Sequence, residues 1–376
     1  MKIGFISTVQ GHQWPGSEYL WSACAAKLMA QQHQVLVWAN SDLRGAKALV
    51  DLTAQGAAIR FLARTSGRIG RLKQKFINPL DKIQAEGLDL LVVSSGSAYD
   101  PVYWPALGQF LLKARVPFMF ICHFNAETFW VDEVMRGMMS DIFQKAAQVI
   151  FVSLDNRRLT ERQLGMSISR ACVIVPPLQV NASGPLPWPE TQNDGPWRLA
   201  CVARLEPRWK GQDVLFEVLS GAGWKDRNFC LSLFGQGEEE SYLRKLSKFY
   251  GLDSKIEFAG FSSPEKIWAG HHLQVLAARG EGGPMVVTEG MWFGRVAVTT
   301  RCGFLGEYVR DGENGFLADF ASPAGFGKKL EEAWTRRAEW KEMGVKAHDF
   351  INQRLSDFNA SDRLLKLILT GSQPAE

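Results

Sequence analysis

The sequence has no paired cysteines and no membrane span, and each absence excludes a class of protein. Its six cysteines occur singly, without metal-ligand or redox spacing, so we expect buried free thiols in a reducing compartment. No apolar run approaches the length of a membrane span, and the chain opens on the apolar stretch 2–6 without a signal-peptide pattern. A cytoplasmic protein is therefore expected.

Common catalytic patterns are also missing. The chain shows no Ser–His–Asp order, no nucleophile elbow and no carboxylate-rich metal cluster. The loop at 8–18 lacks the glycine pattern of dinucleotide-binding folds. His271 and His272 are adjacent, so they cannot share a helix face as metal ligands. We expect neither a metal ion nor another bound cofactor.

The charge is mild but uneven. The net charge is +4, yet six basic residues and no acidic one occur between Arg60 and Lys75. Two interpretations of residues 60–77 remain open: a solvated helix face or loop, or peripheral contact with an anionic membrane or a phosphorylated lipid. Nucleic acid is not an expected partner, because the basic excess is local and lacks aromatic interleaving.

The apolar pattern predicts two α/β domains, as the length of 376 residues also suggests. Short apolar runs alternate with longer segments of mixed polarity, which is typical of parallel, doubly wound (Rossmann-like) sheets. The predicted strands are 2–6, 35–39, 58–62, 89–93, 117–121, 148–152 and 171–175, and then 198–203, 229–234, 255–258, 273–277 and 295–299.

Domain boundaries follow from this alternation. Residues 179–196 contain four prolines and read as a linker between a domain at 1–178 and a domain at 197–354. The last helical segment, about 355–376, is longer than the second domain needs and is expected to pack back on the first. Ligands are expected at the carboxyl ends of the strands, where open α/β sheets bind them.

Two carboxylates near the three-quarter point are the most informative motif. Glu281 and Glu289 bracket seven residues that include Gly282, Gly283 and Pro284. The glycines free the backbone and proline suits a helix start, so Glu281 should precede a helix whose second turn holds Glu289. Helix amides favour a phosphate, and carboxylates bind hydroxyls, so a nucleotide sugar fits this motif.

Two cations follow the first strand of the second domain. Arg204 and Lys210 lie in a strand-to-helix loop, with Lys210 expected to open the next helix. Such a pair suits a diphosphate, although surface charge on an exposed loop is the other interpretation, and Arg208 is equally available by composition.

Further candidates lie where other strands end. In the first domain, Gly16 permits close backbone approach, Ser17 is a candidate helix cap, and His123 directly follows a strand. For His123, a ligand role and a structural role both remain open. In the second domain, Phe261 follows a strand and offers an aromatic edge for a base.

Together these stretches resemble the retaining glycosyltransferases of the GT-B fold, specifically glycosyltransferase family 4. The matching segments lie at 202–211, 233–239, 258–261, 279–291 and 309–317. The resemblance implies two Rossmann-like domains facing across a cleft, with the acceptor bound by 1–178 and the nucleotide sugar by 197–354. The Glu–seven–Glu element together with the upstream Arg/Lys pair is its most specific part.

The resemblance also implies roles. Arg204 and Lys210 would neutralise the donor diphosphate, Glu281 would lie near the transferred sugar and Glu289 would bind the ribose hydroxyls. The remaining positions that it implies are the backbone amides of Gly282, Gly283, Met285 and Val286 at the sugar and distal phosphate, His123 beside the donor sugar, and the Gly16 loop facing the diphosphate.

Three positions depart from the family pattern. Ser17 stands where a second glycine is frequent, and Gly290 and Trp292 stand where alanines are common. A glycine inside a helix costs up to about 1 kcal/mol, so tight packing or close ligand approach should compensate at Gly290.

The expected activity is transfer of a sugar, with retention, from a nucleotide-diphosphate sugar to an acceptor hydroxyl. Surface polysaccharide, lipopolysaccharide or glycolipid assembly is the expected setting, by analogy. The alternatives are a non-catalytic nucleotide-sugar-binding partner of an assembly complex and a GT-B sugar-nucleotide epimerase.

Overall fold

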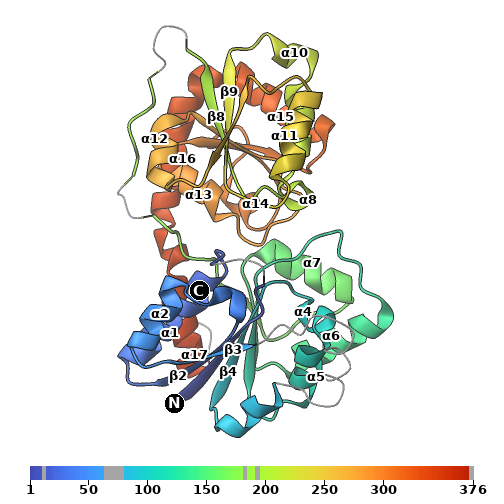
Figure 1. Ribbon diagram of the computed structural model, residues 1–376, viewed down its shortest axis with the longest axis vertical. Coiled ribbons are helices and arrows are strands. Elements are labelled where there is room, and N and C mark those ends of the chain that lie inside the picture. The colour runs from blue at the N-terminus through green and yellow to red at the C-terminus, as the bar shows by residue number, and fades with distance from the viewer. Residues whose placement is uncertain (11–13, 63–79, 181–183, 191–194, 372–376) are drawn as a thin grey trace. The chain divides into compact units, whose positions relative to one another are not determined.

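The computed structural model describes residues 1–10, 14–62, 80–180, 184–190 and 195–371. They form two compact units, Met1–Pro177 with Asp357–Glu376, and Leu178–Ser356 (Figure 1). Each unit has one parallel sheet with helices on both faces, so the predicted fold class is confirmed. No helix in the described part of the chain is long and apolar enough to cross a bilayer.

The first unit is built on a seven-stranded sheet in the order β3-β2-β1-β4-β5-β6-β7. The strands are β1 (Lys2–Ser7), β2 (Gln34–Asn40), β3 (Ala58–Leu62), β4 (Leu90–Ser95), β5 (Phe118–Cys122), β6 (Gln148–Phe151) and β7 (Ala171–Val173). Ile3 of β1 lies opposite both Val35 and Leu90, so β1 is an interior strand. From β1 the chain continues to β2 and β3 on one side and then returns to β4 and the later strands on the other side. The boundary between β1 and β4 is therefore the switch point of this sheet.

Both faces of this sheet are covered. The helices are α1 (Glu18–Ala30), α2 (Lys47–Ala54), α4 (Asp100–Tyr103), α5 (Pro105–Lys113), α6 (Glu133–Lys145), α7 (Leu154–Leu164) and α17 (Ala360–Thr370). Along β4, Val92 joins one apolar cluster and Leu91 and Val93 join the other. This period of two explains why the strands read as continuous apolar runs in the sequence.

The last helix, α17, belongs to the first unit although it follows the second along the chain. It packs on α1, and Leu364, Leu367 and Ile368 are buried in the same cluster as the α1 residues. Lys27 of α1 forms an ion pair with Asp362.

The second unit has a six-stranded sheet in the order β10-β9-β8-β11-β12-β13. The strands are β8 (Trp197–Val202), β9 (Phe229–Phe234), β10 (Ile256–Gly260), β11 (Leu273–Leu276), β12 (Val296–Thr300) and β13 (Phe316–Ala318). The helices are α8 (Pro207–Lys210), α9 (Gln212–Leu219), α10 (Ala222–Lys225), α11 (Glu240–Phe249), α12 (Pro264–Gly270), α13 (Met285–Trp292), α14 (Leu305–Tyr308), α15 (Pro323–Thr335) and α16 (Trp340–Gln353). Only β13 has no counterpart among the predicted strands.

A buried arginine ties the proline-rich residues 184–189 to this unit. Arg295 is 1% exposed, and its guanidinium donates to backbone carbonyls of three segments. The acceptors are the carbonyl oxygens of Leu186, Pro187, Trp268, His271, Phe293 and Gly294, at 2.6–3.3 Å. Burial lowers the pKa of Arg295 to about 10, so the group stays charged at neutral pH.

A buried histidine adds a second tie to the same segment. The ring of His272 accepts a hydrogen bond from the amide of Arg198 and donates one to the carbonyl of Pro189, both at 3.0 Å. Burial lowers its pKa to about 4, which agrees with a neutral, structural ring. Both His271 and His272 thus use their ring nitrogens in hydrogen bonds within the protein.

Candidate functional site

The second unit brings its candidate residues to one edge of the sheet. β8 lies between β9 and β11, and the chain runs first to β9 and β10 and later to β11, β12 and β13. The carboxyl ends of β8 and β11 therefore flank a switch point, the usual ligand position of an open α/β sheet. The loop after β8 carries Arg204 and Lys210, and the loop after β11 carries Glu281.

Lys210 and Glu281 meet as an ion pair. The Lys210 Nζ hydrogen-bonds to the Glu281 Oε1, and the two side chains are only 15% and 10% exposed. Lys210 is the last residue of α8, so the expectation that it opens the next helix is wrong; Gly211, with φ of +64°, separates α8 from α9. The structure thus couples the predicted phosphate cation directly to the predicted sugar carboxylate.

Arg204 lies at the start of the same loop. Its guanidinium contacts the Glu206 carboxylate at 2.9 Å, and its side chain is 47% exposed. Its backbone carbonyl accepts a hydrogen bond from the buried Gln212 amide at 2.7 Å, which fixes the loop against α9. Arg204 is therefore positioned by its backbone, with the side chain at the surface.

Close backbone contacts hold the loops of this edge together. A Cβ at Gly211 would lie 1.8 Å from the carbonyl oxygen of Ala277, and one at Gly235 would lie 2.1 Å from that of Ala203. Both glycines also have positive φ, so a side chain at either position would be strained as well as crowded. Gly235, directly after β9, is thus explained by its packing against the β8 loop.

Arg279 locks the β11 loop onto α8 and α9. Its guanidinium makes a bidentate ion pair with Asp213 at 2.7 and 2.8 Å and also donates to the Pro207 carbonyl at 2.7 Å. Its amide donates to the Trp209 carbonyl at 2.7 Å. Sequence reasoning missed this residue, because its two partners lie 66 and 72 positions away and nothing local marks them.

Glu289 lies in the second turn of α13, as predicted. It is 9% exposed, and burial raises its pKa to about 7, with a smaller contribution from the charge of Glu265. Pro284 was expected at the first position of this helix. It is instead the N-cap, so α13 begins one residue later, at Met285. The Met285 amide donates to the Gly283 carbonyl at 2.8 Å, so that one of the predicted donor-binding amides already has an internal partner.

Gly290 is explained by packing. An ideal Cβ at this position would lie 2.4 Å from the Gln274 Oε1 and 3.1 Å from the Trp268 ring. Glycine therefore allows α13 to approach β11 and α12 closely. Tight packing, one of the two compensations expected for a helical glycine, is present here.

The buried Glu289 carboxyl predicts a pH-dependent stability. Its folded pKa of about 7 exceeds the ordinary value of 4.5, so between these pH values the folded chain keeps a proton that the unfolded chain releases. The stabilisation is complete below pH 4.5 and is lost as the pH rises through about 7. Relative to Glu289→Gln, the wild type should lose up to about 3 kcal/mol over this range.

Urea unfolding of both proteins at several pH values measures this difference. Glu18, whose pKa burial also raises to about 7, is present in both and cancels in the comparison. Parallel stability profiles for wild type and Glu289→Gln would contradict the assignment of the titration to Glu289.

In the first unit, His123 lies at the carboxyl end of β5. It is 8% exposed, its Nε2 is 3.0 Å from the Ser94 Oγ, and its amide donates to the Ser95 carbonyl at 3.1 Å. Burial lowers its pKa to about 4, so the ring is neutral at neutral pH. The structure thus places His123 beside the end of β4, one strand from the switch point.

Gly16 precedes α1 at the same edge and is exposed. A Cβ there would meet no described residue within 4 Å, so no contact among these residues requires glycine. Ser17 is the N-cap residue of α1, as expected, but its hydroxyl makes no capping hydrogen bond and donates to the Glu18 carboxylate at 3.3 Å. The fully buried Glu18, which also accepts from the Trp21 indole at 2.9 Å, was not singled out from the sequence.

The remaining candidates are more peripheral. Phe261 is 87% exposed and follows the edge strand β10. Most of the basic stretch 60–77 lies outside the described residues; of the described part, Arg60 pairs with Glu86. Among the described residues, no group of three His, Cys, Asp or Glu side chains is arranged to hold a metal ion.

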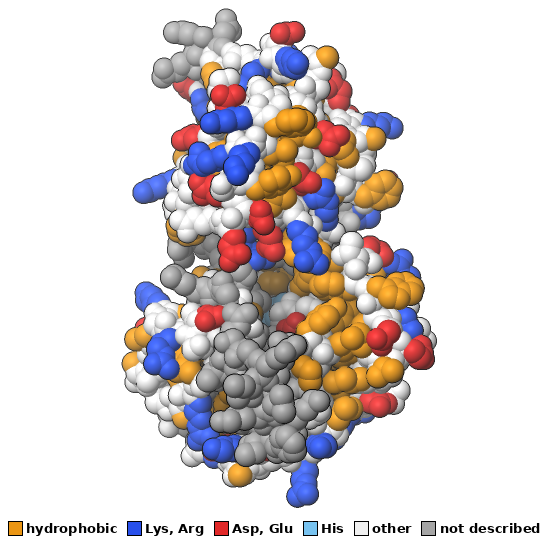
Figure 2. All heavy atoms as spheres, turned by 45° about the vertical axis from the view of Figure 1, so that its right-hand side comes forward, with side chains coloured by type: hydrophobic (Ala, Val, Ile, Leu, Met, Phe, Trp, Pro, Cys, Tyr) orange, Lys and Arg blue, Asp and Glu red, His pale blue; other side chains and the backbone are white. Residues whose placement is uncertain are grey.

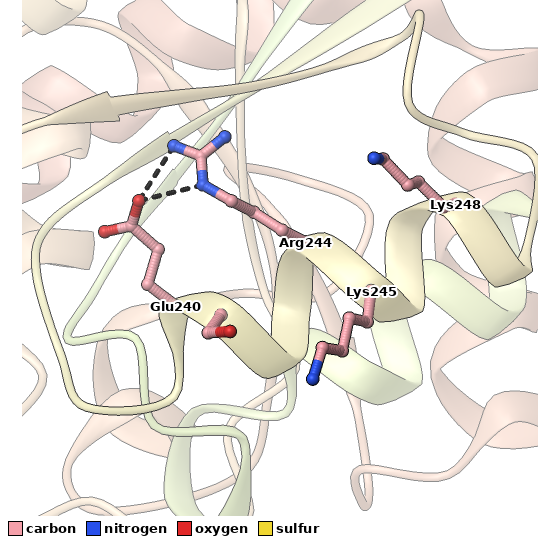
Figure 3. Close-up of a pocket in the computed structure, with 5 residues that line it drawn as sticks. Glu240, Arg244, Lys245 and Lys248 are labelled. Carbon is pink, nitrogen blue, oxygen red and sulfur yellow. Dashed lines mark hydrogen bonds and ion pairs between the residues drawn. The ribbon is translucent and has the colours of Figure 1, made fainter.

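A shallow hollow on α11 lies outside this set (Figure 3). It is lined by Glu240, Ser241, Arg244, Lys245 and Lys248, and the Arg244 guanidinium donates twice to the Glu240 carboxylate at 2.8 and 2.9 Å. All five come from the exposed side of one helix, so this hollow adds no residue to the candidate site.

Residues 186–350, most of the second unit, match the family model "Glycosyl transferases group 1". The chain is similar to an uncharacterized glycosyltransferase of Methanocaldococcus jannaschii, with 29% identity over 42% of this chain and 44% of that protein. It is also similar to the lipopolysaccharide core biosynthesis glycosyltransferase LpsE of Rhizobium meliloti, with 27% identity over 37% of this chain and 41% of that protein. The matches thus span less than half the length of these relatives.

Solved structures resemble the whole chain. HepE of Anabaena, in complex with UDP, has a TM-score of 0.74 at 18% identity and covers 98% of this chain and 100% of its own. The lipopolysaccharide outer core galactosyltransferase WaaB has a TM-score of 0.66 at 16% identity, and the match covers 96% of this chain and 99% of WaaB. At these identities the likeness establishes the fold, and it confirms two Rossmann-like units of the GT-B type.

Proposed function

We propose that this chain is a glycosyltransferase that moves a sugar from a nucleotide-diphosphate sugar to an acceptor hydroxyl, with retention at the anomeric carbon. The observation that carries the proposal is the Lys210–Glu281 pair at the switch point of a unit that matches the group 1 model. This pair unites a cation and a carboxylate from two loops that converge where such sheets bind ligands.

The chemistry assigned to each residue follows from its position. The diphosphate leaving group develops negative charge, and Lys210 with Arg204 would stabilise it through preorganised electrostatics. Glu281 would then exchange Lys210 for hydroxyls of the transferred sugar. Glu289, near the start of α13, would bind the ribose hydroxyls as an acceptor, and this role requires its ionised form.

Retention is proposed to proceed by front-face displacement. The leaving phosphate accepts the acceptor's proton as the new glycosidic bond forms and the bond to the diphosphate breaks. No side chain is assigned as a nucleophile, and no metal is required by this scheme. His123 and the Gly16 loop keep the roles that the resemblance gives them, beside the donor sugar and the diphosphate.

Donor and setting are proposed from the relatives. HepE was solved with UDP and with UDP-glucose, so a uridine diphosphate sugar is the first donor to test. LpsE and WaaB are named for lipopolysaccharide synthesis, which favours a surface-glycan acceptor. Peripheral contact of residues 60–77 with an anionic membrane is a separate proposal, and liposome sedimentation that ignores anionic lipid content would contradict it.

A panel of nucleotides and nucleotide sugars tests the function. We expect at least one nucleoside diphosphate to bind by calorimetry, its sugar to be consumed, and NMR of the product to show the donor's anomeric configuration. Glu281→Gln should lose turnover, and its circular dichroism spectrum and urea midpoint show how far the loss of the Lys210 partner also lowers stability.

Three results would contradict parts of this proposal. An inverted product excludes retention, and donor binding without turnover under any acceptor mixture favours a non-catalytic binding partner. Conversion of the sugar nucleotide to its epimer favours the epimerase. If no nucleotide binds, the glycosyltransferase proposal fails.

A further inference from the structure

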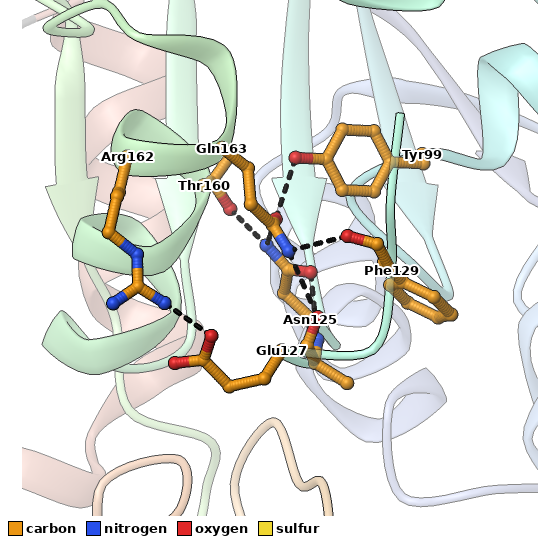
Figure 4. Close-up of polar contacts among 8 residues, drawn as sticks. Tyr99, Asn125, Glu127, Phe129, Thr160, Arg162 and Gln163 are labelled. Atoms are coloured by element: carbon orange, nitrogen blue, oxygen red, sulfur yellow. Dashed lines mark hydrogen bonds and ion pairs between the residues drawn. The ribbon is translucent and has the colours of Figure 1, made fainter. Parts of the chain in front are cut away.

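The loop that joins β5 to α6 in the first unit is held by a half-buried side chain, that of Gln163. Gln163 of α7 donates from its Nε2 to the carbonyl oxygens of Ala126 and Phe129, at 3.0 and 2.9 Å (Figure 4). These two acceptors lie three residues apart in the loop. One amide group therefore fixes the course of the backbone between them.

Gln163 is itself fixed in position. Its Oε1 accepts from the Tyr99 hydroxyl at 2.7 Å and from the Asn125 amide at 2.8 Å, and Asn125 also donates to the Thr160 hydroxyl at 2.7 Å. Figure 4 shows these side chains converging on Gln163 from three parts of the unit. All four hydrogen-bonding positions of the Gln163 amide are used, which defines its orientation.

Arg136 secures the far end of the loop. Its Nη2 donates to the Val131 carbonyl at 3.0 Å, its Nε donates to the Gln163 carbonyl at 2.9 Å, and its Nη1 pairs with Glu133. The loop is thus tied at Ala126, Phe129 and Val131. A backbone with this many internal bonds has little freedom to rearrange.

Trp130 stands between two of these tied positions and is 84% exposed. Its neighbour Phe129 faces the other way, with ring-centroid distances of 5.6 Å to Phe124, 6.2 Å to Tyr99 and 6.5 Å to Tyr103. A large apolar side chain held in water by an ordered loop is unfavourable for the isolated protein. Tyr103, whose ring contacts Phe129, is also exposed, so this part of the unit presents more than one aromatic side chain to water.

The position of Trp130 favours a small ligand of the proposed reaction. The same loop begins at His123, directly after β5, and so belongs to the strand edge where this sheet is expected to bind ligands. Figure 2 shows hydrophobic side chains gathered on a face of this unit. Tyr103, which follows β4 in α4, is 60% exposed at that edge as well.

The surrounding charges disfavour an anionic membrane. The charged side chains of the loop and its contacts include three carboxylates, Glu127, Asp132 and Glu133, and two cations, Arg162 and Arg136, which pair with Glu127 and Glu133. An anionic lipid surface attracts basic residues and would be repelled here. A pyranose ring suits this composition, because its CH face packs on an aromatic ring while its hydroxyls can donate to carboxylates.

We infer that Trp130 is a stacking surface for a pyranose ring of a neutral carbohydrate acceptor. The inference rests on the proposed function and extends it, since it names the class of acceptor and one residue that binds it. Gln163 and Arg136 act as positioning residues, because they hold the loop that carries Trp130 without reaching the ligand themselves.

The full-length chain with Trp130→Ala tests the inference. Saturation-transfer NMR with neutral trisaccharides of glucose, galactose and N-acetylglucosamine should show binding to the wild type and about tenfold weaker binding to the variant. In the transfer assay, the acceptor KM should rise about tenfold while the donor KM is unchanged. Val134→Ala, at a position that is 82% exposed in the first turn of α6, is the matched control and should behave as wild type.

The outcomes separate this inference from the function on which it rests. Nucleotide binding without any Trp130-dependent binding of trisaccharide overturns the inference and leaves the proposed function standing. Trp130-dependent sedimentation with phosphatidylcholine vesicles, in place of trisaccharide binding, also overturns it. Trp130-dependent trisaccharide binding in a protein that binds no nucleotide would contradict the proposed function instead.

Discussion

Replacing Lys210 by alanine should lower kcat/KM for the nucleotide sugar about 10²–10³-fold, a loss typical of removing one preorganised group that stabilises developing charge. Lys210 lies at the switch point, and its ammonium is held by Glu281 before any donor arrives. The variant would lack the cation proposed to stabilise the diphosphate and would leave Glu281 without its partner. Steady-state kinetics with the donor found in the nucleotide panel measures this effect.

Arg208→Ala is the matched control for Lys210. Arg208 lies two residues earlier in α8 and is exposed, with its guanidinium 4.8 Å from the Trp209 ring centroid. By composition alone, Arg208 and Lys210 are equally good candidates to bind a phosphate. Of the two, only Lys210 pairs with Glu281 at the candidate site. Arg208→Ala should therefore change kcat/KM by less than about threefold. Equal losses in the two variants would remove Lys210 from the proposed mechanism.

A double variant separates catalysis from stability. Removing one partner of a buried ion pair strands the other charge, so Lys210→Ala is also expected to destabilise the fold. Lys210→Met with Glu281→Gln removes both charges and should recover most of that stability. It should remain as inactive as the single variant, and recovery of turnover would show that the single variant failed by misfolding.

Arg295→Met should produce the largest loss of stability, about 3–5 kcal/mol in the free energy of unfolding. Six backbone carbonyls from 186–187, 268–271 and 293–294 accept from one guanidinium that is 1% exposed. Methionine fills similar volume but removes the donor shared by these carbonyls, of which Phe293 keeps a second bond from the Leu186 amide at 3.2 Å. The urea midpoint of the second unit, followed by tryptophan fluorescence, measures the effect.

Two further variants define the cause. Arg295→Lys keeps the charge but offers three donors in place of five, so it should recover only part of the stability. Arg310→Met, at a side chain that is 61% exposed, should change the free energy by less than about 0.5 kcal/mol. A midpoint for Arg295→Met equal to that of wild type would mean that water reaches the carbonyls and replaces the arginine.

The strands could be predicted because burial on both faces makes them continuous apolar runs. Residues 90–93 of β4 and all of Phe118–Cys122 contribute alternate side chains to two apolar clusters, so no polar residue interrupts these runs. Phe316–Ala318 was missed because its apolar run ends at Asp319 after three residues, whereas the equally short β7 lies within the longer apolar run 171–175. The position of Glu289 followed from local helix signals, which act over a single turn.

The contacts that organise the candidate site could not be predicted in the same way. Lys210 and Glu281 are 71 residues apart, and their pairing depends on β8 and β11 becoming neighbours in the sheet. Arg295 and Gln163 bind backbone carbonyls, and a carbonyl leaves no mark in the sequence because every residue has one. Nor does a sequence show that Trp130 remains exposed when the aromatic side chain beside it is packed away.

Because α17 packs in the first unit, the two units differ in whether one continuous stretch of the chain can encode them. Leu178–Ser356 is one uninterrupted stretch, so a single open reading frame can encode the second unit, and nucleotide binding can be assayed on that product alone. A fragment that stops at Pro177 would lack α17 and expose the apolar face of α1 that Leu364 and Ile368 cover. Residues 1–177 should therefore aggregate unless a peptide spanning Asp357–Gly371 is supplied with them or fused through a new linker.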